Sequence, residues 1–139
     1  MREIKFRGIS IDTGKWVYGY FVYGELSKQY FIVNESAIGL HKFTRVLPDT
    51  VGQYTGLKDK NGIEIYEGDI VLLNADLKFK NSTTGEVIKS YAKIIYKEGA
   101  FQYEYLTKPQ KPDSYRFEYH NMNLHKVIGN IYENKELLK

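Results

Sequence analysis

Short runs of β-branched and aromatic residues, each ended by a turn signal, follow one another along almost the whole chain. The densest run covers residues 16–23, and a Gly24–Lys28 loop separates it from the apolar run at residues 30–33. Such residues fit a pleated, half-buried surface, and a short loop between two such runs predicts a hairpin. The pattern predicts an antiparallel, mostly-β fold with little helix, either a small barrel or a sandwich.

The middle of the chain carries the strongest turn signals. Asn61-Gly62 predicts a type I′ hairpin turn, because both central residues of that turn need a positive φ. The alternating segment 63–66 follows, and Glu67-Gly68-Asp69 then interrupts it. Residues 70–73, Ile-Val-Leu-Leu, predict a buried central strand entered through this glycine bend.

The rest of the chain continues the pattern of strands and turns. We expect a polar loop or hairpin tip at 76–86, strands at 87–96 and 100–106 joined by Lys97-Glu98-Gly99, a rigid polar turn at 108–113, alternation at Tyr115, Phe117 and Tyr119, and a closing strand at 127–132. A short C-terminal helix over Asn134–Lys139 is expected, with Asn134 at its N-cap. The core is expected to include Ile70, Val71, Val127, Ile128 and Ile131.

Length and composition predict one domain in a reducing compartment. The chain of 139 residues has the usual size of a single domain, so we expect one domain over residues 1–139. It contains no cysteine, which excludes disulfides and thiolate metal sites and fits a reducing cytoplasm. No apolar run is long enough for a membrane helix, and the first residues lack the apolar core of a signal peptide.

Three segments together resemble one protein family. They are Arg2–Gly8 with Trp16–Gly19, Val51–Gly62 continuing through Glu64–Val71, and Val127–Asn134 with Leu137-Leu138. In their order and spacing the chain resembles the YopX-like family of small bacteriophage and prophage proteins. The resemblance implies a mostly-β fold and an origin in a phage or prophage, and it implies no activity or catalytic residue.

The residues that carry chemistry favour structural roles. Asp59, Glu64, Glu67 and Asp69 cluster near the middle, but Asp59 suits a hairpin loop and Asp69 a turn in which its carboxylate accepts backbone amides. The chain has no nucleophile elbow and no phosphate-binding glycine loop. The histidines are expected on the surface or in loops; they are His41, His120 and His125. We therefore expect no enzymatic activity, no cofactor and no metal site.

Single-stranded nucleic acid is the alternative partner that the sequence suggests. Small β-barrels bind single strands by stacking bases on exposed aromatic rings beside basic side chains. Interleaved acids and the formal net charge of +3 argue against a strongly basic surface. The residues that would form such a site are Lys5, Arg7, Lys89, Tyr91, Lys93, Tyr103 and Tyr105.

The aromatic content fits, first of all, a β-rich core with amphipathic strand faces, and only its surplus over the needs of a small core supports a protein partner. The chain has 13 Tyr, 7 Phe and 1 Trp, more than a small core needs. Tyrosine suits interfaces, because its ring packs while its hydroxyl group stays hydrated. We expect a non-enzymatic interaction module that binds a host protein, a phage protein or a second copy of itself.

Overall fold

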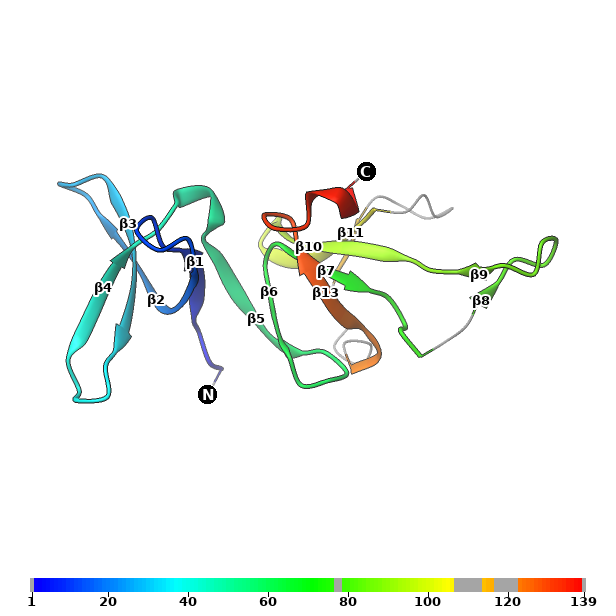
Figure 1. The fold of residues 1–139 in the computed structure, drawn as a ribbon, viewed down its shortest axis with the longest axis horizontal. Coiled ribbons are helices and arrows are strands. Elements are labelled where there is room, and N and C mark those ends of the chain that lie inside the picture. Colours follow the sequence, from blue (N-terminus) through cyan, green and yellow to red (C-terminus); the bar gives the residue numbers. More distant parts are fainter. Residues whose placement is uncertain (1, 77–78, 107–113, 117–122, 139) are drawn as a thin grey trace. The chain divides into compact units, whose positions relative to one another are not determined.

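The computed structural model describes residues 2–76, 79–106, 114–116 and 123–138 (Figure 1). The expected turn at 108–113, the alternation at Phe117 and Tyr119, and His120 lie outside these residues. The chain divides into two compact units, Met1–Gly56 and Leu57–Lys139, and each is described by itself. The expectation of one domain over residues 1–139 stays a prediction.

The first unit is an antiparallel meander. Its elements are β1 (Phe6–Ile9), β2 (Trp16–Gly24), β3 (Gln29–Glu35), β4 (His41–Arg45), the 3-10 helix η1 (Pro48–Thr50) and β5 (Gly52–Lys58), which crosses into the second unit. The strand order in this sheet is β4-β3-β2-β1-β5-β6, where β6 (Glu64–Tyr66) belongs to the second unit. The hairpin predicted at Gly24–Lys28 joins β2 to β3.

A curl in this sheet forms the core of the first unit. An isolated bridge pairs Ser10, just after β1, with Val46, just after β4, so the sheet is partly closed at this corner. Val46 is buried against Gly8, where a Cβ atom would lie 2.9 Å from the Val46 Cβ. Glycine at position 8 therefore permits the close approach of the two strand ends.

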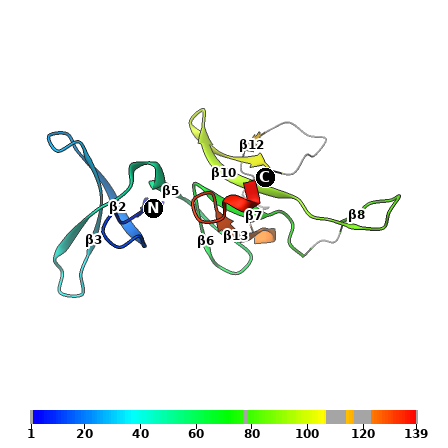
Figure 2. The ribbon, with the colours of Figure 1, turned by 45° about the horizontal axis from the view of Figure 1, so that its top comes forward.

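The second unit is built around a second antiparallel sheet. The strands of the whole unit are β6, β7 (Asp69–Leu72), β8 (Phe79–Lys80), β9 (Val87–Ile88), β10 (Tyr91–Lys97), β11 (Ala100–Tyr105), β12 (Ser114–Arg116) and β13 (Lys126–Asn130). The five-stranded sheet has the order β12-β11-β10-β7-β13. The strand expected at 87–96 is therefore split, and β8 and β9 form a separate hairpin that projects from the start of β10 in both views (Figures 1 and 2).

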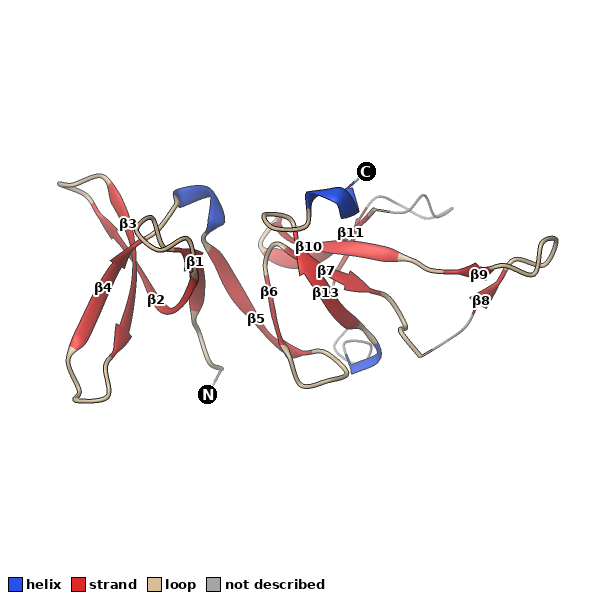
Figure 3. Ribbon diagram, in the orientation of Figure 1, coloured by secondary structure: helices blue, strands red, loops and turns tan. Residues whose placement is uncertain are grey.

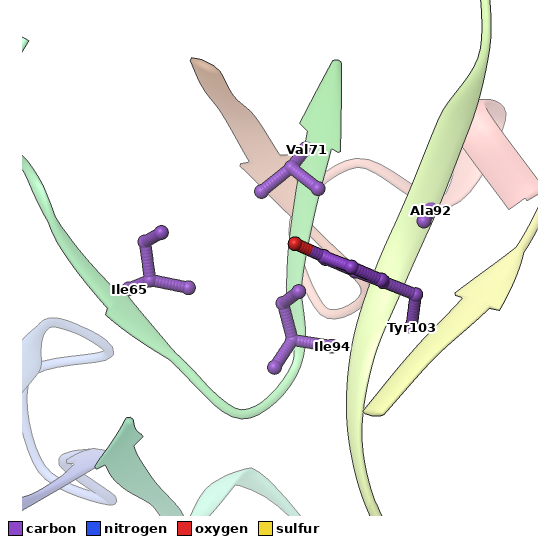
Figure 4. Close-up of a cluster of buried hydrophobic side chains, with 5 residues drawn as sticks. All are labelled: Ile65, Val71, Ala92, Ile94 and Tyr103. Atoms are coloured by element: carbon purple, nitrogen blue, oxygen red, sulfur yellow. The ribbon is translucent and has the colours of Figure 1, made fainter. Parts of the chain in front are cut away.

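The core of the second unit lies between β6 and the five-stranded sheet. Figure 4 shows its buried side chains, Ile65, Val71, Ala92, Ile94 and Tyr103, which come from β6, β7, β10 and β11. Among the residues expected in the core, Ile70 and Val71 are fully buried. The other expected core residues, Val127, Ile128 and Ile131, are only partly buried.

The turn at Asn61-Gly62 differs from the type I′ turn that the sequence predicted. Gly62 has a positive φ of 79°, but Asn61 does not, so the turn is not type I′. Instead, the Asp59 carboxylate accepts the amides of Asn61 and Ile63 and shapes a three-residue loop that ends with glycine. The pair of positive φ angles that type I′ requires occurs at Glu98 (53°) and Gly99 (76°), between β10 and β11.

Among the residues that the structure describes, helix is confined to short 3-10 turns (Figure 3). In place of the helix expected over Asn134–Lys139, the chain forms only the single 3-10 turn η3 (Lys135–Leu138). The Asn134 side chain accepts the backbone amide of Asn130, so it does not form the predicted N-cap. No helix in the described part of the chain has the length and apolarity needed to cross a membrane. The prediction of a mostly-β, antiparallel fold is confirmed, as two large sheets and the small β8–β9 hairpin rather than one closed barrel.

Candidate functional site

Asp59, one of the four acids that cluster near the middle of the sequence, has a structural role in the fold. Its side chain is buried and accepts three backbone amides, from Asn61 (2.8 Å), Ile63 (2.9 Å) and Val127 (2.9 Å). The last of these bonds ties the hairpin after β5 to the start of β13. These bonds assign Asp59 a structural role, as the sequence predicted.

The second buried acid, Asp69, holds the bend before β7. Its carboxylate accepts the Tyr66 amide at 2.8 Å, as expected for an aspartate in a turn. Gly68 has a φ of 89°, and a Cβ atom there would lie 2.9 Å from the Tyr132 ring. The glycine is therefore required by its conformation and by the ring beside it. Glu64 and Glu67 are half-buried.

His125 lies in a loop, as one of the two predicted alternatives, but it is buried there rather than exposed on the surface. Its Nδ1 atom accepts the Asn74 amide at 2.9 Å, and its ring meets Tyr103 edge-on at 5.5 Å. Burial lowers the pKa of His125 from 6.5 to about 4, because the charged imidazolium would lose its hydration. The imidazole is therefore neutral at pH 7, with its proton on Nε2. His41 is exposed on β4, as predicted.

The residues expected to bind nucleic acid fall in both units. In the first unit, Lys5 pairs with Glu3 at 3.2 Å and lies over the Tyr54 ring, while Arg7 is buried over the Trp16 ring at 4.3 Å. These contacts stabilise the sheet around β1. The five other residues belong to the second unit, so the nucleic-acid surface predicted from the sequence stays a prediction.

In the second unit, the predicted residues differ widely in exposure. Tyr103 is only 6% exposed and forms part of the core, so its ring offers no face to a base. Lys93 pairs with Glu104 at 3.0 Å across β10 and β11. Tyr91 and Tyr105 are half-buried, and Lys89 is exposed before β10. Within the described ranges, no group of three acids or histidines could hold a metal ion.

An exposed apolar row runs along β2 in the first unit. Tyr18, Tyr20 and Val22 alternate along the strand and therefore point to the same face, which we call the β2 stripe. All three are exposed, and Tyr20 is exposed to 69%. Isolated apolar residues are common on protein surfaces, but a contiguous row on one sheet face is typical of a binding surface.

A cleft opens where the turn after β1 meets β4. Its volume is about 350 Å³, and it lies entirely within the first unit. Backbone bonds from Ile11 to Arg45 and from Leu47 to Ile9 hold the two strand ends together. The cleft combines cationic, aromatic and hydroxyl side chains; it is lined by Ser10, Asp12, Thr13, Lys15, Trp16, Val17, Lys42, Phe43, Thr44 and Arg45.

The sequence analysis missed this cleft because it assigned no element to β4. One signal was present: His41, Lys42 and Arg45 place basic side chains around Phe43. Phe43 is 61% exposed and meets Phe31 edge-on. Basic residues interleaved with an aromatic residue are typical of anion-binding strands, but their nearness to Lys15 depends on the curl of the sheet.

Comparison with known proteins places this chain in a family. Residues 5–139 match the family model described as YopX protein. The crystal structure of protein EF1440 from Enterococcus faecalis is similar, with 28% sequence identity, a TM-score of 0.58 and coverage of 100% of both chains. No curated protein matches the chain. Since the family model matches nearly the whole sequence, the chain belongs to the YopX family.

Proposed function

We propose that this chain is a non-enzymatic protein-interaction module of a phage or prophage that works in the bacterial cytoplasm. We further propose that the β2 stripe binds a second copy of the same chain. The observation that carries the proposal is the exposure of Tyr18, Tyr20 and Val22 on one face of β2. Tyrosines contribute large, rigid contact areas at protein interfaces.

The charge distribution supports a face-to-face pairing of two copies. The three residues of the β2 stripe carry no charge, so the stripe itself brings no like charges together when two copies meet there. One edge of this sheet is β4, and it carries His41, Lys42 and Arg45. Pairing of two β4 edges would place Lys42 and Arg45 of the two copies close together, and charged edges generally resist such pairing.

The absence of catalysis is part of the proposal. Asp59 and Asp69 belong to the acidic cluster that the sequence analysis considered for catalysis, and both carboxylates are buried and bound to backbone amides. His125 uses its Nδ1 lone pair to accept the Asn74 amide. These groups serve the fold, and their bonds leave them poorly placed to exchange protons with a substrate.

Light-scattering mass measurement tests the proposal. The parent chain is expected to be a dimer whose dissociation changes little with salt, because the contact is apolar. Tyr20→Lys would place like charges at the centre of the pairing and should give a monomer, whereas Tyr20→Phe should remain a dimer. Tyr96→Lys is the matched control, because Tyr96 is an exposed tyrosine on β10 of the second unit.

Three results would contradict the self-association proposal. The first is a parent chain that is monomeric at high micromolar concentration. The second is a dimer that Tyr20→Lys leaves intact, and the third is equal disruption by Tyr96→Lys. A monomer that binds a phage or host protein through Tyr20 would keep the interaction module but replace the second copy as its partner. Reproducible hydrolase or nuclease turnover that Asp59→Asn or Asp69→Asn abolishes would refute the non-enzymatic assignment.

A further inference from the structure

We propose that the cleft between the β1–β2 turn and β4 binds a nucleotide, either free or as one residue of a single strand. The ligand class is a phosphate joined to an aromatic heterocycle. The site differs from the nucleic-acid surface that the sequence suggested, and it lies outside the β2 stripe. This inference therefore stands or falls separately from self-association.

Three cations make the cleft attractive to a phosphate. Lys15, Lys42 and Arg45 line it together with one acid, Asp12, which pairs with Arg45 at 3.6 Å. In the described part of the chain, no carboxylate lies within ion-pair distance of the Lys15 or Lys42 ammonium group. These two lysines can thus bind a phosphate without first giving up an internal ion pair.

The aromatic lining selects an anion that carries a ring. Phe43 is 61% exposed, and Trp16 is partly exposed beside it in the lining of the same cleft. The Arg7 guanidinium lies 4.3 Å from the centre of the Trp16 ring and restricts the movement of the indole. Rings held in place beside cations are the elements that proteins use to stack bases.

The size and hydroxyl groups of the cleft fit one nucleotide. A volume of about 350 Å³ is near the lower end of the range for small-molecule sites, roughly 300–1,000 Å³. Ser10, Thr13 and Thr44 add hydroxyl groups to the lining. Hydroxyl groups can both donate and accept hydrogen bonds, so they suit the polar edge of a base or a sugar. An anion without a ring would leave the aromatic lining unused.

The only tryptophan of the chain lines this cleft, so its fluorescence reports on the site directly. The full-length protein is titrated with uridine monophosphate, ribose phosphate, inorganic phosphate and a short oligouridylate. Saturable quenching by the nucleotide is expected, with weaker binding of ribose phosphate and phosphate. Free tryptophan titrated in parallel corrects for absorption by the base.

Substitutions in the cleft should change the affinity in opposite directions. Lys42→Ala or Lys15→Ala should weaken oligouridylate binding roughly 5-fold and lower the salt slope by about 1. Phe43→Ala should weaken it roughly 5- to 100-fold through lost stacking. Asp12→Asn should tighten it roughly 2- to 5-fold, because it frees Arg45 and removes a repelling charge. Lys97→Ala, an exposed lysine on β10, is the matched control.

The outcomes separate a free nucleotide from a strand. If uridine monophosphate binds as tightly as the oligouridylate, the ligand is a free nucleotide; if only the oligouridylate binds tightly, the ligand is a strand. The proposal is overturned if neither ligand quenches Trp16 at millimolar concentration. It is also overturned if Lys42→Ala and Lys97→Ala bind equally well, or if a phosphotyrosine peptide binds while both nucleotide ligands fail.

Discussion

The two units use alternating aromatic strands in opposite ways. In the first unit, Tyr18 and Tyr20 of β2 face outward and remain exposed. In the second unit, Tyr103 of β11 faces inward and packs with Ile94 and His125. Alternation thus determines which residues share a face, but the elements that pack on that face determine whether it becomes a core or a surface.

The largest expected effect on stability comes from a substitution in the core of the second unit. Ile94→Ala should lower the free energy of unfolding by about 2–5 kcal/mol, because it leaves a cavity beside Tyr103. Tyr20→Ala on the exposed β2 should change it by less than about 0.5 kcal/mol in the monomer. Urea denaturation followed by circular dichroism measures both values, and equal costs would contradict the contrast between the units.

The same experiment shows whether the two units unfold together. Trp16 reports on the first unit only, whereas circular dichroism reports on both. Because β5 continues from one unit into the other, we expect the two units to unfold together. Ile94→Ala should then lower the urea midpoint by the same amount whether unfolding is followed by tryptophan fluorescence or by circular dichroism. Separate transitions would show that the chain consists of two domains.

The next effect concerns the polar interior of the second unit. Asp59→Asn replaces one carboxylate oxygen with an amide nitrogen that cannot accept a backbone amide. We expect a loss of about 1–3 kcal/mol, together with faster hydrogen exchange at the Val127 amide. Asp12→Asn is the control, because Asp12 is exposed in the first unit. Unchanged protection at Val127 would show that Asp59 does not hold β13.

A pH-dependent effect should come from His125. Its pKa is about 4 in the folded chain and 6.5 in the unfolded chain, so between these values the unfolded chain binds more protons. Stability should therefore fall as the pH falls from 6.5 towards 4, by up to about 1.4 kcal/mol per pH unit from this residue.

The control for this pH effect is His125→Asn, which keeps an acceptor for the Asn74 amide without a titrating ring. Urea denaturation across the pH range should give a flatter profile for this variant than for the parent chain. Identical profiles for the two proteins would assign the pH dependence to other groups.

The smallest effect compares the lysines of the two units. Lys93→Ala removes a partly exposed ion pair with Glu104, and it should lower stability by only about 0.2–1 kcal/mol. It should leave nucleotide affinity unchanged, in contrast to Lys42→Ala. A loss of nucleotide binding in Lys93→Ala would move the binding surface to the second unit.

Local sequence rules predicted most of the strands but not every turn type. The hairpin at Gly24–Lys28 follows from residue type, and the apolar run at 70–73 predicts the strand that the structure forms as β7 (Asp69–Leu72). The Asn61-Gly62 turn differs from the prediction because the Asp59 carboxylate reshapes the loop. That carboxylate also binds Val127, so part of its environment comes from a strand far away in the sequence.

The candidate cleft could not be predicted in the same way. Lys15 and Lys42 approach each other only because the sheet curls until Ser10 pairs with Val46. No pattern within β2 or β4 encodes that curl; the contact of Gly8 with Val46 encodes part of it. Likewise, the burial of His125 depends on Asn74 and Tyr103, which lie in other segments of the chain.

The bond from the Val127 amide to Asp59 also sets an order of events during protein synthesis. It joins residues 68 positions apart, so a ribosome that adds roughly 5–20 residues per second needs roughly 3–14 s to make the second partner after the first. Until then β7 has no β13 to pair with along one edge, and the Asp59 carboxylate lacks one of its three hydrogen-bond donors. The strands β1 to β4 have already been made by that time, so the nascent chain can form the β2 stripe and the cleft before it completes the second unit.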